Sequence, residues 1–293
     1  MQQISKKHHY IPQFYLRNFT NVENKFHIYL VKENRYKANG KLFSPETHFF
    51  EKNGNTLIIR DEPTDFLETD FYGDLDNDVA QLFNKIKYST EERHGLTEAD
   101  MPMLQFFVAH LFWRNPSNDK FVKDLLQRKG LSGLGLNISN TNTKQILLDS
   151  EFEKEIVGND SSYKIIKYWL PFLLFQNLIG NDSPLTILRF NPGEKPSLIC
   201  DNPLILRNPQ DFDVYKDDFI LPLSGDKVLI RTTRLKPTYH NLSRVLIDHL
   251  LIKQANTFVS TTDLQYILQL NKIKEDISIE ELRRQVFECF VDG

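Results

Sequence analysis

The first residues whose types could do chemistry lie in KKHHYIPQFYLRNF, near the start of the chain. Adjacent His8 and His9 supply imidazoles, the side chains that most often move protons or bind metal ions near neutral pH. Because neighbouring residues of an extended segment point to opposite sides, at most one of them is expected in any one metal site. The alternative is that one histidine is hydrogen-bonded in the core and the other is solvated. Further polar binding groups in this stretch are Tyr10, Gln13 and Arg17.

A second set of polar residues lies in FVAHLFWRNP, an otherwise apolar stretch. His110 and Arg114 are four residues apart, so a helix would place them on one face, one turn from each other. A buried arginine keeps its charge and requires a carboxylate or a phosphate. Arg114 therefore either forms an internal ion pair or marks an anion-binding pocket, and the ion pair is the more ordinary outcome.

The third candidate is the Asp-Asn-Pro that follows the apolar run SLIC. Asp201 then stands at the end of a predicted strand, where its carboxylate could face a histidine or a metal, with Asn202 beside it. Asp-Asn-Pro is also an ordinary way to start a turn. Both roles are compatible, because a turn can hold a carboxylate in place.

These candidates need secondary-structure elements to position them. Pro12 suits the first position of a helix, which predicts one or two turns from about Pro12 to Phe19. The runs FHIYLVKE, THFFEK and NTLIIRDE predict a small N-terminal antiparallel β-meander. Apolar residues spaced by three and four between Phe71 and Ile86 predict a helix led by acidic residues. A buried central helix should follow, broken at Asn115-Pro116.

The C-terminal half has the strongest sheet pattern. LTILRF, SLICDNPLIL, DFILPLS and DKVLIRTT predict four strands of a mixed or antiparallel sheet. KIIKYWLPFLLFQNLIG is apolar enough to cross the core as a helix. HNLSRVLIDHLLIKQANTFVST and IEELRRQVFECF are expected to be helices that cover one face of the sheet. We therefore expect one α+β domain over residues 1–293, with a mobile loop at about residues 130–143.

Composition limits the functional classes. The 293 residues are 40% hydrophobic and carry a formal charge of −3, so no global attraction to nucleic acid is expected, although a local basic patch is open. The two cysteines are expected to be small core residues in a reducing compartment. With no apolar run of ~20 residues and no signal peptide, we expect a cytoplasmic protein without a membrane segment. Familiar phosphate-loop, dinucleotide, zinc-protease and nucleophile-elbow motifs are absent.

The segments HHYIPQFYLRNF, DFYGDLDNDVAQLF, FFVAHLFWRNP, CDNPLIL and ANTFVST together resemble the Domain of Unknown Function 4238 family over nearly the whole chain. The resemblance implies one architecture and a shared set of polar positions rather than a reaction. A glutamate is frequent in the acidic helix of that family, whereas this chain has Asp74, Asp76 and Asp78 there. The shared positions are His9, Tyr10, Pro12, Arg17, Arg114, Asp201, Asn202 and Pro203.

Two functional hypotheses follow from these residues. One is a nuclease-like hydrolase of phosphodiester bonds, in which His8 or His9 is a base or metal ligand, Asp201 is the carboxylate and Arg114 stabilises phosphate charge. A divalent metal and a nucleotide or nucleic-acid partner would fit this chemistry. The other is a non-catalytic module that binds a nucleotide, a peptide or a protein. A buried network that only fixes the N-terminal segment is a third, purely structural outcome.

Overall fold

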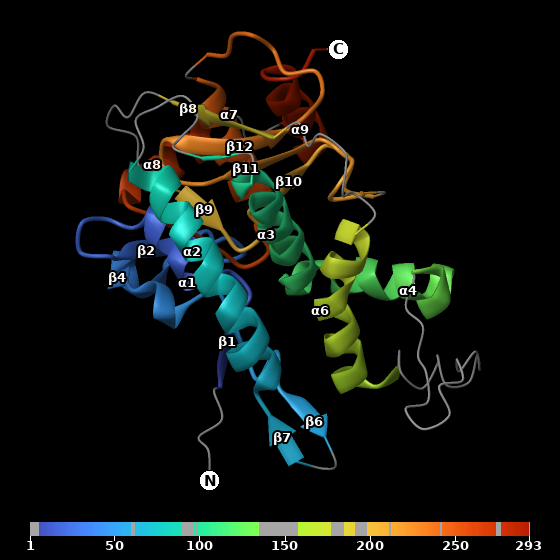
Figure 1. The fold of residues 1–293 in the computed structure, drawn as a ribbon. Helices are drawn as coiled ribbons and strands as arrows, with labels where there is room; N and C mark the ends of the chain where they lie inside the picture. Colours follow the sequence, from blue (N-terminus) through green and yellow to red (C-terminus); the bar gives the residue numbers. More distant parts are fainter. Residues whose placement is uncertain are drawn as a thin grey trace, which may run out of the picture.

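A four-stranded antiparallel sheet of order β10-β11-β12-β8 forms the centre of the C-terminal half in the computed structural model (Figure 1). The structure describes residues 6–59, 62–88, 96–97, 99–134, 158–176, 185–190, 198–210, 212–240, 242–273 and 277–292. Each run that was predicted to be a strand contains one, but SLICDNPLIL forms two, Leu198–Cys200 and Ile205–Leu206, and only the second belongs to this sheet. The strands of this sheet are β8 (Leu185–Arg189), β10 (Ile205–Leu206), β11 (Phe219–Pro222) and β12 (Lys227–Arg231).

Both faces of this sheet are buried, whereas one covered face was predicted. Phe219 and Leu221 of β11 pack into the apolar cluster that holds α2 and α3, while Ile220 between them packs into the cluster that holds α7 and α9. Strand side chains alternate between faces, so helices on both sides explain why consecutive residues in the middle of these strands are apolar. The covering helices are α2 (Gly73–Tyr88), α3 (Asp100–Arg114), α7 (Ser243–Gln254) and α9 (Ile279–Glu288).

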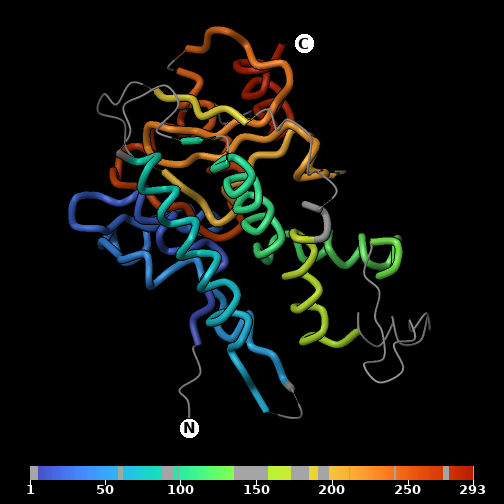
Figure 2. Tube along the Cα trace, viewed as in Figure 1, coloured from blue at the N-terminus to red at the C-terminus, as the bar shows by residue number. Residues whose placement is uncertain are grey.

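A second antiparallel sheet joins the two ends of the chain. Val259 of β13 lies opposite Tyr29 of β2 on one side and opposite Cys200 of β9 on the other. Figure 2 shows the blue N-terminal strands next to the orange and red C-terminal part of the trace. The strands are β2 (Phe26–Leu30), β3 (Arg35–Tyr36), β4 (Leu42–Phe43), β9 (Leu198–Cys200) and β13 (Phe258–Thr261).

Two further predictions about strands were wrong. The segment ANTFVST was assigned to a helix, but α7 ends at Gln254 and the β-branched run after it forms β13, followed by α8 (Leu264–Ile273). The N-terminal strands also do not form one meander, because their partners lie in separate sheets. Local propensity marks a strand but does not select its partner. The remaining N-terminal strands form two pairs, β1 (Lys7–His9) with β5 (Phe50–Lys52) and β6 (Leu57–Ile59) with β7 (Glu62–Thr64).

The predicted N-terminal helix is confirmed as α1 (Gln13–Leu16) followed by one turn, η1 (Arg17–Phe19). Its apolar side is fully buried, and the Tyr15 hydroxyl donates a hydrogen bond to the carbonyl of Pro222 at the end of β11. The Tyr15 ring also packs edge-on against Phe83 of α2 and Phe107 of α3. These contacts fix the polar N-terminal residues to the body of the protein.

The central helix ends at Arg114, and the predicted break at Asn115-Pro116 is confirmed. The Asn115 side chain accepts a hydrogen bond from the Ser117 amide, which starts the turn η5 (Pro116–Asn118) and then α4 (Asp119–Gly133). Of the loop predicted at about residues 130–143, residues 130–133 belong to α4, and those after 134 lie outside the described residues.

The remaining long helix is α6 (Asp160–Gln176), which packs against α3 beside the projecting β6–β7 hairpin (Figure 1). Ser161 Oγ accepts a hydrogen bond of 2.7 Å from the Ile58 amide, which ties α6 to that hairpin. Within the described residues, no helix has the length and apolar character needed to cross a bilayer. Short turns η2 (Lys37–Gly40) and η3 (Pro45–Thr47) and the π-helical segment η4 (Leu67–Tyr72) complete the elements.

Candidate functional site

Arg114 is buried at the end of α3 and forms the internal ion pair that was the more ordinary of its two predicted roles. Its Nη1 donates to both carboxylate oxygens of Asp76, at 2.9 and 3.1 Å, and its Nη2 lies 3.8 Å from Glu68. The guanidinium carbon is 4.2 Å from the ring centre of Tyr72. Burial opposes the charge, but Asp76 and Glu68 outweigh it and raise the pKa of Arg114.

A chain of polar contacts connects His8 to this arginine. The Nδ1 atom of His8 accepts a hydrogen bond of 2.7 Å from the Asn55 amide. The Asn55 side chain donates to Glu68 Oε2, also at 2.7 Å, and Glu68 lies beside Arg114. The structure therefore brings the first predicted histidine and the predicted arginine into one network through two residues that sequence reasoning did not identify.

His9 lies next to the same network but is a weak base. Burial and the charge of Arg114 lower the pKa of His9 to about 4, although Glu68 and the backbone of Pro45 partly oppose this. Gln13 Nε2 lies 3.4 Å from its Nδ1, and the Gln13 carbonyl oxygen accepts from the exposed Arg17 at 3.5 Å. An imidazole with such a low pKa stays neutral at pH 7 and accepts a proton poorly.

Asp201 is close to this region but its carboxylate has a structural partner set. It accepts backbone hydrogen bonds from Asn256, Thr257 and Phe258 at 2.8, 2.7 and 3.3 Å. None of its hydrogen bonds within the described part of the chain involves a histidine. Burial raises the pKa of Asp201 in spite of these three donors. The carboxylate therefore braces the start of β13 against the end of β9.

The neighbours of Asp201 connect it to the end of α3. The Asn115 side chain donates a hydrogen bond of 2.8 Å to the carbonyl of Asp201. The carbonyl of Asn202 accepts hydrogen bonds from the Gln254 side chain and the Cys200 thiol, at 2.5 and 3.1 Å. Tyr10 donates a backbone hydrogen bond of 3.1 Å to Phe49, and burial and then the charges of Asp201 and Glu51 raise the pKa of its hydroxyl.

His110 is enclosed by aromatic rings rather than directed at a ligand. The ring centroids of Phe106 and Phe172 lie 4.5 and 5.2 Å from it, and Tyr72 and Tyr168 complete the enclosure. Burial, and to a smaller extent Arg114, lowers the pKa of His110 to about 3. The ring is therefore neutral at pH 7 and serves as a core residue.

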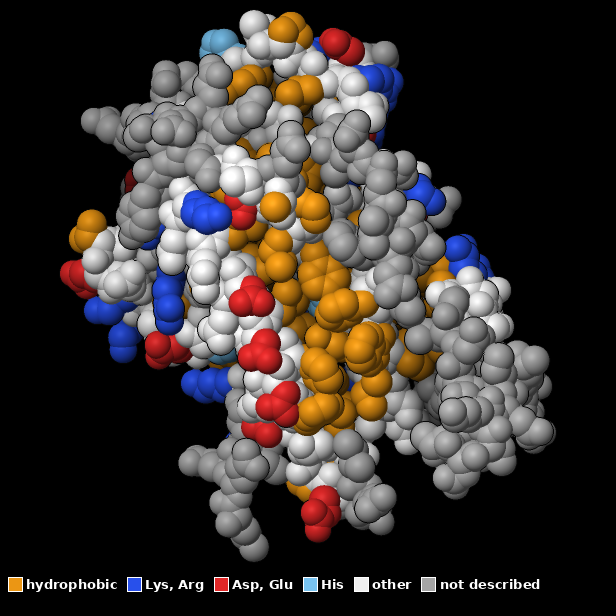
Figure 3. All heavy atoms as spheres, in the orientation of Figure 1, with side chains coloured by type: hydrophobic (Ala, Val, Ile, Leu, Met, Phe, Trp, Pro, Cys, Tyr) orange, Lys and Arg blue, Asp and Glu red, His pale blue; other side chains and the backbone are white. Residues whose placement is uncertain are grey.

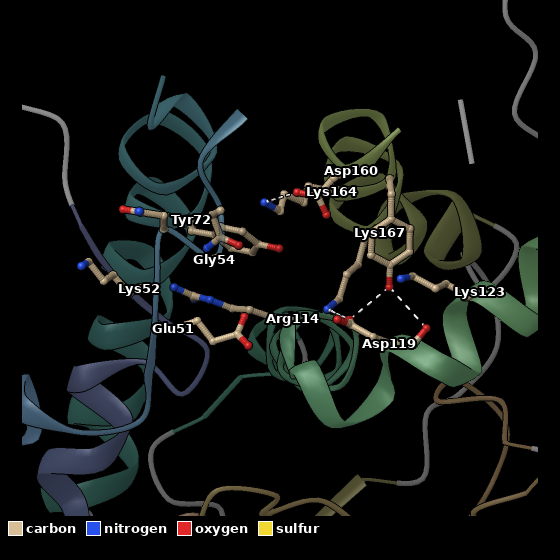
Figure 4. Close-up of a pocket in the computed structure, with 13 residues that line it drawn as sticks. Glu51, Lys52, Gly54, Tyr72, Arg114, Asp119, Lys123, Asp160, Lys164 and Lys167 are labelled. Atoms are coloured by element: carbon tan, nitrogen blue, oxygen red, sulfur yellow. Dashed lines mark hydrogen bonds and ion pairs between the residues drawn. The ribbon is translucent and has the colours of Figure 1, made fainter. Parts of the chain in front are cut away.

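A cavity of about 430 Å³ opens beside Arg114, between the turn after β5, the start of α4 and one side of α6 (Figure 4). Of the site residues that were predicted from the sequence, only Arg114 lines this cavity. On α6, residues 160, 163, 164 and 167 share one face by helical spacing, and two of them, Lys164 and Lys167, lie in the stretch that was interpreted as a core helix. The lining residues are Glu51, Lys52, Asn53, Gly54, Asn55, Tyr72, Arg114, Asp119, Lys123, Asp160, Tyr163, Lys164 and Lys167.

Asp119, at the first turn of α4, organises the far wall of the cavity. It forms an ion pair with Lys167 and accepts a hydrogen bond of 3.0 Å from the Tyr163 hydroxyl (Figure 4). Burial lowers the pKa of Lys167, although Asp119 opposes the shift. Lys164 pairs with Asp160 at 2.6 Å and donates to the Thr56 carbonyl at 3.1 Å. Lys167 and Lys164 are thus held at the cavity by the carboxylates of Asp119 and Asp160.

Glu51 faces these lysines from β5 (Figure 4). Its carboxylate forms no hydrogen bond or ion pair with any described residue. Burial raises the pKa of Glu51, the charge of Asp119 adds to the increase, and Lys167 and Lys164 oppose it. A Cβ atom at Gly54 would lie 2.8 Å from Glu51 Cβ, so glycine leaves the space in which this side chain lies. The Glu51 side chain is nevertheless exposed, and a carboxylate with a raised pKa is suited to proton transfer.

The described part of the chain contains no ready-made ligand set for the divalent metal that the sequence led us to expect. No three residues among its histidines, cysteines, aspartates and glutamates are grouped so as to hold an ion. The cavity's acidic groups Glu51, Asp119 and Asp160 are separated by the lysines between them, as Figure 4 shows. Charge recognition by lysine and arginine is therefore the chemistry that this cavity offers directly.

Replacing Asp201 with alanine should destabilise the protein by about 2–4 kcal/mol, because three buried amides lose their acceptor. Chemical denaturation would measure the loss. The exposed Asp124→Ala on α4 is the matched control and should change the free energy of unfolding by less than ~0.5 kcal/mol. Equal stability of Asp201→Ala and the parent would show that the carboxylate is not a structural brace.

The buried histidines should make the fold sensitive to acid. Since the pKa of His110 is lowered from 6.5 to about 3, the unfolded chain binds a proton that the folded chain refuses as the pH falls below 6.5. The free energy of unfolding should therefore decrease on acidification, by up to ~1.4 kcal/mol per pH unit for this ring. Denaturation curves of His110→Phe should show a shallower pH slope between pH 4 and 6.5 and a parallel one above pH 7. Identical slopes at acid pH would refute this assignment.

The comparisons with known proteins agree with the resemblance in the sequence. A family model described as "Protein of unknown function (DUF4238)" matches residues 7–273, a range that includes both main sheets, the Arg114 network and the cavity. No curated protein and no solved structure matches the chain. The chain belongs to the DUF4238 family of proteins of unknown function.

Proposed function

We propose that the cavity beside Arg114 binds a small phosphorylated ligand, with a nucleotide as the best-fitting class. The observation that carries the proposal is the convergence of five cationic side chains from four elements on one cavity: Lys52, Arg114, Lys123, Lys164 and Lys167. Lysine and arginine are the usual partners of phosphate oxygens. The volume, about 430 Å³, is in the usual range of roughly 300–1,000 Å³ for small-molecule sites.

The charge balance supports an anionic ligand at the mouth of the cavity. Asp119 and Asp160 are engaged by Lys167 and Lys164. The Nζ atom of Lys123 lies 5.0 Å from the centre of the Tyr163 ring. Neither Lys123 nor the exposed Lys52 forms an ion pair with a described residue. These two lysines are therefore available to a phosphate. Lys164 and Lys167, which are paired with carboxylates, add positive charge to the same cavity.

The other lining groups favour a nucleotide over inorganic phosphate. The side-chain amides of Asn53 and Asn55 can form hydrogen bonds to the edge of a base, and the largely buried rings of Tyr72 and Tyr163 form part of the cavity wall. A bare phosphate would leave these groups without a role.

Titration calorimetry with ATP, pyrophosphate and a short single-stranded RNA tests the proposal. We expect ATP to bind more tightly than pyrophosphate, and Lys52→Met and Lys123→Met each to weaken ATP binding roughly fivefold, for a loss of about 1 kcal/mol. Affinity should fall with added salt. Lys216→Met is the control, because its side chain is 71% exposed and lies outside the cavity. Absence of binding for all three probes, or equal affinities of the variants and the parent, would overturn the proposal.

Hydrolysis of a phosphodiester is the second candidate function, and the unpaired Glu51 is the observation that favours it. Its raised pKa suits a base that takes a proton from the attacking water. The lowered pKa of Lys167 suits a group that gives a proton to the leaving oxygen. In this form of the hydrolase hypothesis Glu51 and Lys167 take the roles first given to His8, His9 and Asp201, and Arg114 lies at the cavity to stabilise phosphate charge.

Glu51→Gln separates the two candidates. If the protein hydrolyses RNA or a nitrophenyl phosphodiester, this variant should bind ATP at least as well as the parent, because one negative charge is removed, but lose about 10²–10³-fold in turnover. Glu46→Gln, outside the cavity, should keep full turnover. Unchanged turnover in Glu51→Gln would refute the role of Glu51, and no turnover by the parent would refute hydrolysis while leaving ligand binding intact.

A further inference from the structure

An exposed aromatic face lies on the side of α6 away from the cavity. Phe66, Met103 and Trp169 are 40%, 36% and 42% exposed, which is unusual for such large apolar side chains. Contacts between rings connect Phe66 and Trp169 into one surface. Phe66 lies 4.7 Å from Phe71, Phe71 lies 6.2 Å from Trp169, and Trp169 lies 5.3 Å from Phe172. We define the aromatic face as Phe66, Phe71, Trp169 and Phe172.

The space-filling view shows this apolar area as continuous and bordered on one side by a row of acidic side chains along α2 (Figure 3). Asp70, Asp74 and Asp78 are exposed and follow one another at intervals of four residues. None of them forms an ion pair with a described residue. Like charges at this spacing repel each other along a helix, so the row leaves negative charge on this surface that a cationic partner could neutralise.

We propose that the aromatic face and its acidic row form a docking surface for a cationic amphipathic helix of a partner protein. Large exposed apolar areas with a polar rim are typical of interaction sites, and a helix that lays its apolar side on such a surface is a common mode of recognition. Lysines or arginines beside the partner's apolar stripe would neutralise Asp70, Asp74 and Asp78. This charge complementarity selects a basic partner.

The acidic row also disfavours two other ligands that an apolar surface could bind, an anionic lipid surface and a second copy of the chain. An anionic lipid surface would meet three aspartates of its own sign. A second copy of the chain in a two-fold arrangement that brought the acidic rows together would have to bury like charges. The docking surface is also separate from the proposed nucleotide site. By helical spacing, Tyr163, Lys164 and Lys167 point to one side of α6, and Trp169 and Phe172 point to the other.

Fluorescence anisotropy with a labelled synthetic helix of leucine and lysine tests the proposal. The parent should bind this peptide and should bind a matched peptide of leucine and glutamate at least about tenfold more weakly. Trp169→Ser should weaken binding of the lysine peptide by about tenfold or more, because it removes a large aromatic anchor. Leu268→Ser, at a leucine 38% exposed on α8, is the matched control and should bind normally.

A second variant does not depend on the packing of Trp169. Asp74→Asn/Asp78→Asn keeps the fold, because both side chains are exposed, and should weaken binding and reduce its dependence on salt. Asp124→Asn on α4 should do neither. Equal affinity for the two peptides, or no effect of either surface variant, would overturn the proposal. So would a dimer in sedimentation that Trp169→Ser abolishes, because the occupant would then be a second copy of the chain.

Discussion

A charge buried at the end of α3 sets much of the geometry of this protein. The guanidinium of Arg114 cannot lose its proton, so the fold must surround it with acceptors. Asp76 approaches from α2 and Glu68 from the segment before it, while the Tyr72 ring covers one face. Removing Asp76 would leave only Glu68, 3.8 Å from Nη2, beside the buried guanidinium, and breaking a buried ion pair commonly costs about 3–5 kcal/mol. The ion pair therefore joins the end of α3 to α2.

Hydrogen bonds formed by residues next to this ion pair connect it to the strands. Asn115 holds the backbone at Asp201, and the Asp201 carboxylate in turn holds the first amides of β13. On the other side, Glu68 reaches His8 in β1 through Asn55. The N-terminal segment, the central helix and the second sheet are thus joined by polar contacts, and two of the residues in them, Asn55 and Arg114, also line the cavity. The buried network predicted as a purely structural role is present, and it also supports one wall of the proposed site.

The two proposed binding surfaces lie on opposite sides of helix α6. One side presents lysines and Tyr163 to the cavity, and the other presents Trp169 and Phe172 to the aromatic face. In the sequence the whole segment is apolar enough to be interpreted as a core helix, and its amphipathic character is concealed because both sides carry large hydrophobic groups. Glu51 was overlooked for a different reason. A single glutamate in a strand has no spacing pattern, and its importance comes only from the helices opposite it.

The sequence by itself determined the class of the fold, the N-terminal helix after Pro12, the strands of the C-terminal half, the break at Asn115-Pro116 and the family. These follow from local physics: proline geometry, apolar periodicity and β-branched runs act over a few residues. Only the tertiary structure decided that Asp76 neutralises Arg114, that Asp201 binds amides instead of a histidine, and that β2 pairs with β13. Each of these depends on which distant groups meet, and a buried charge or an unpaired strand edge accepts any suitable partner that the packing of the whole chain brings to it.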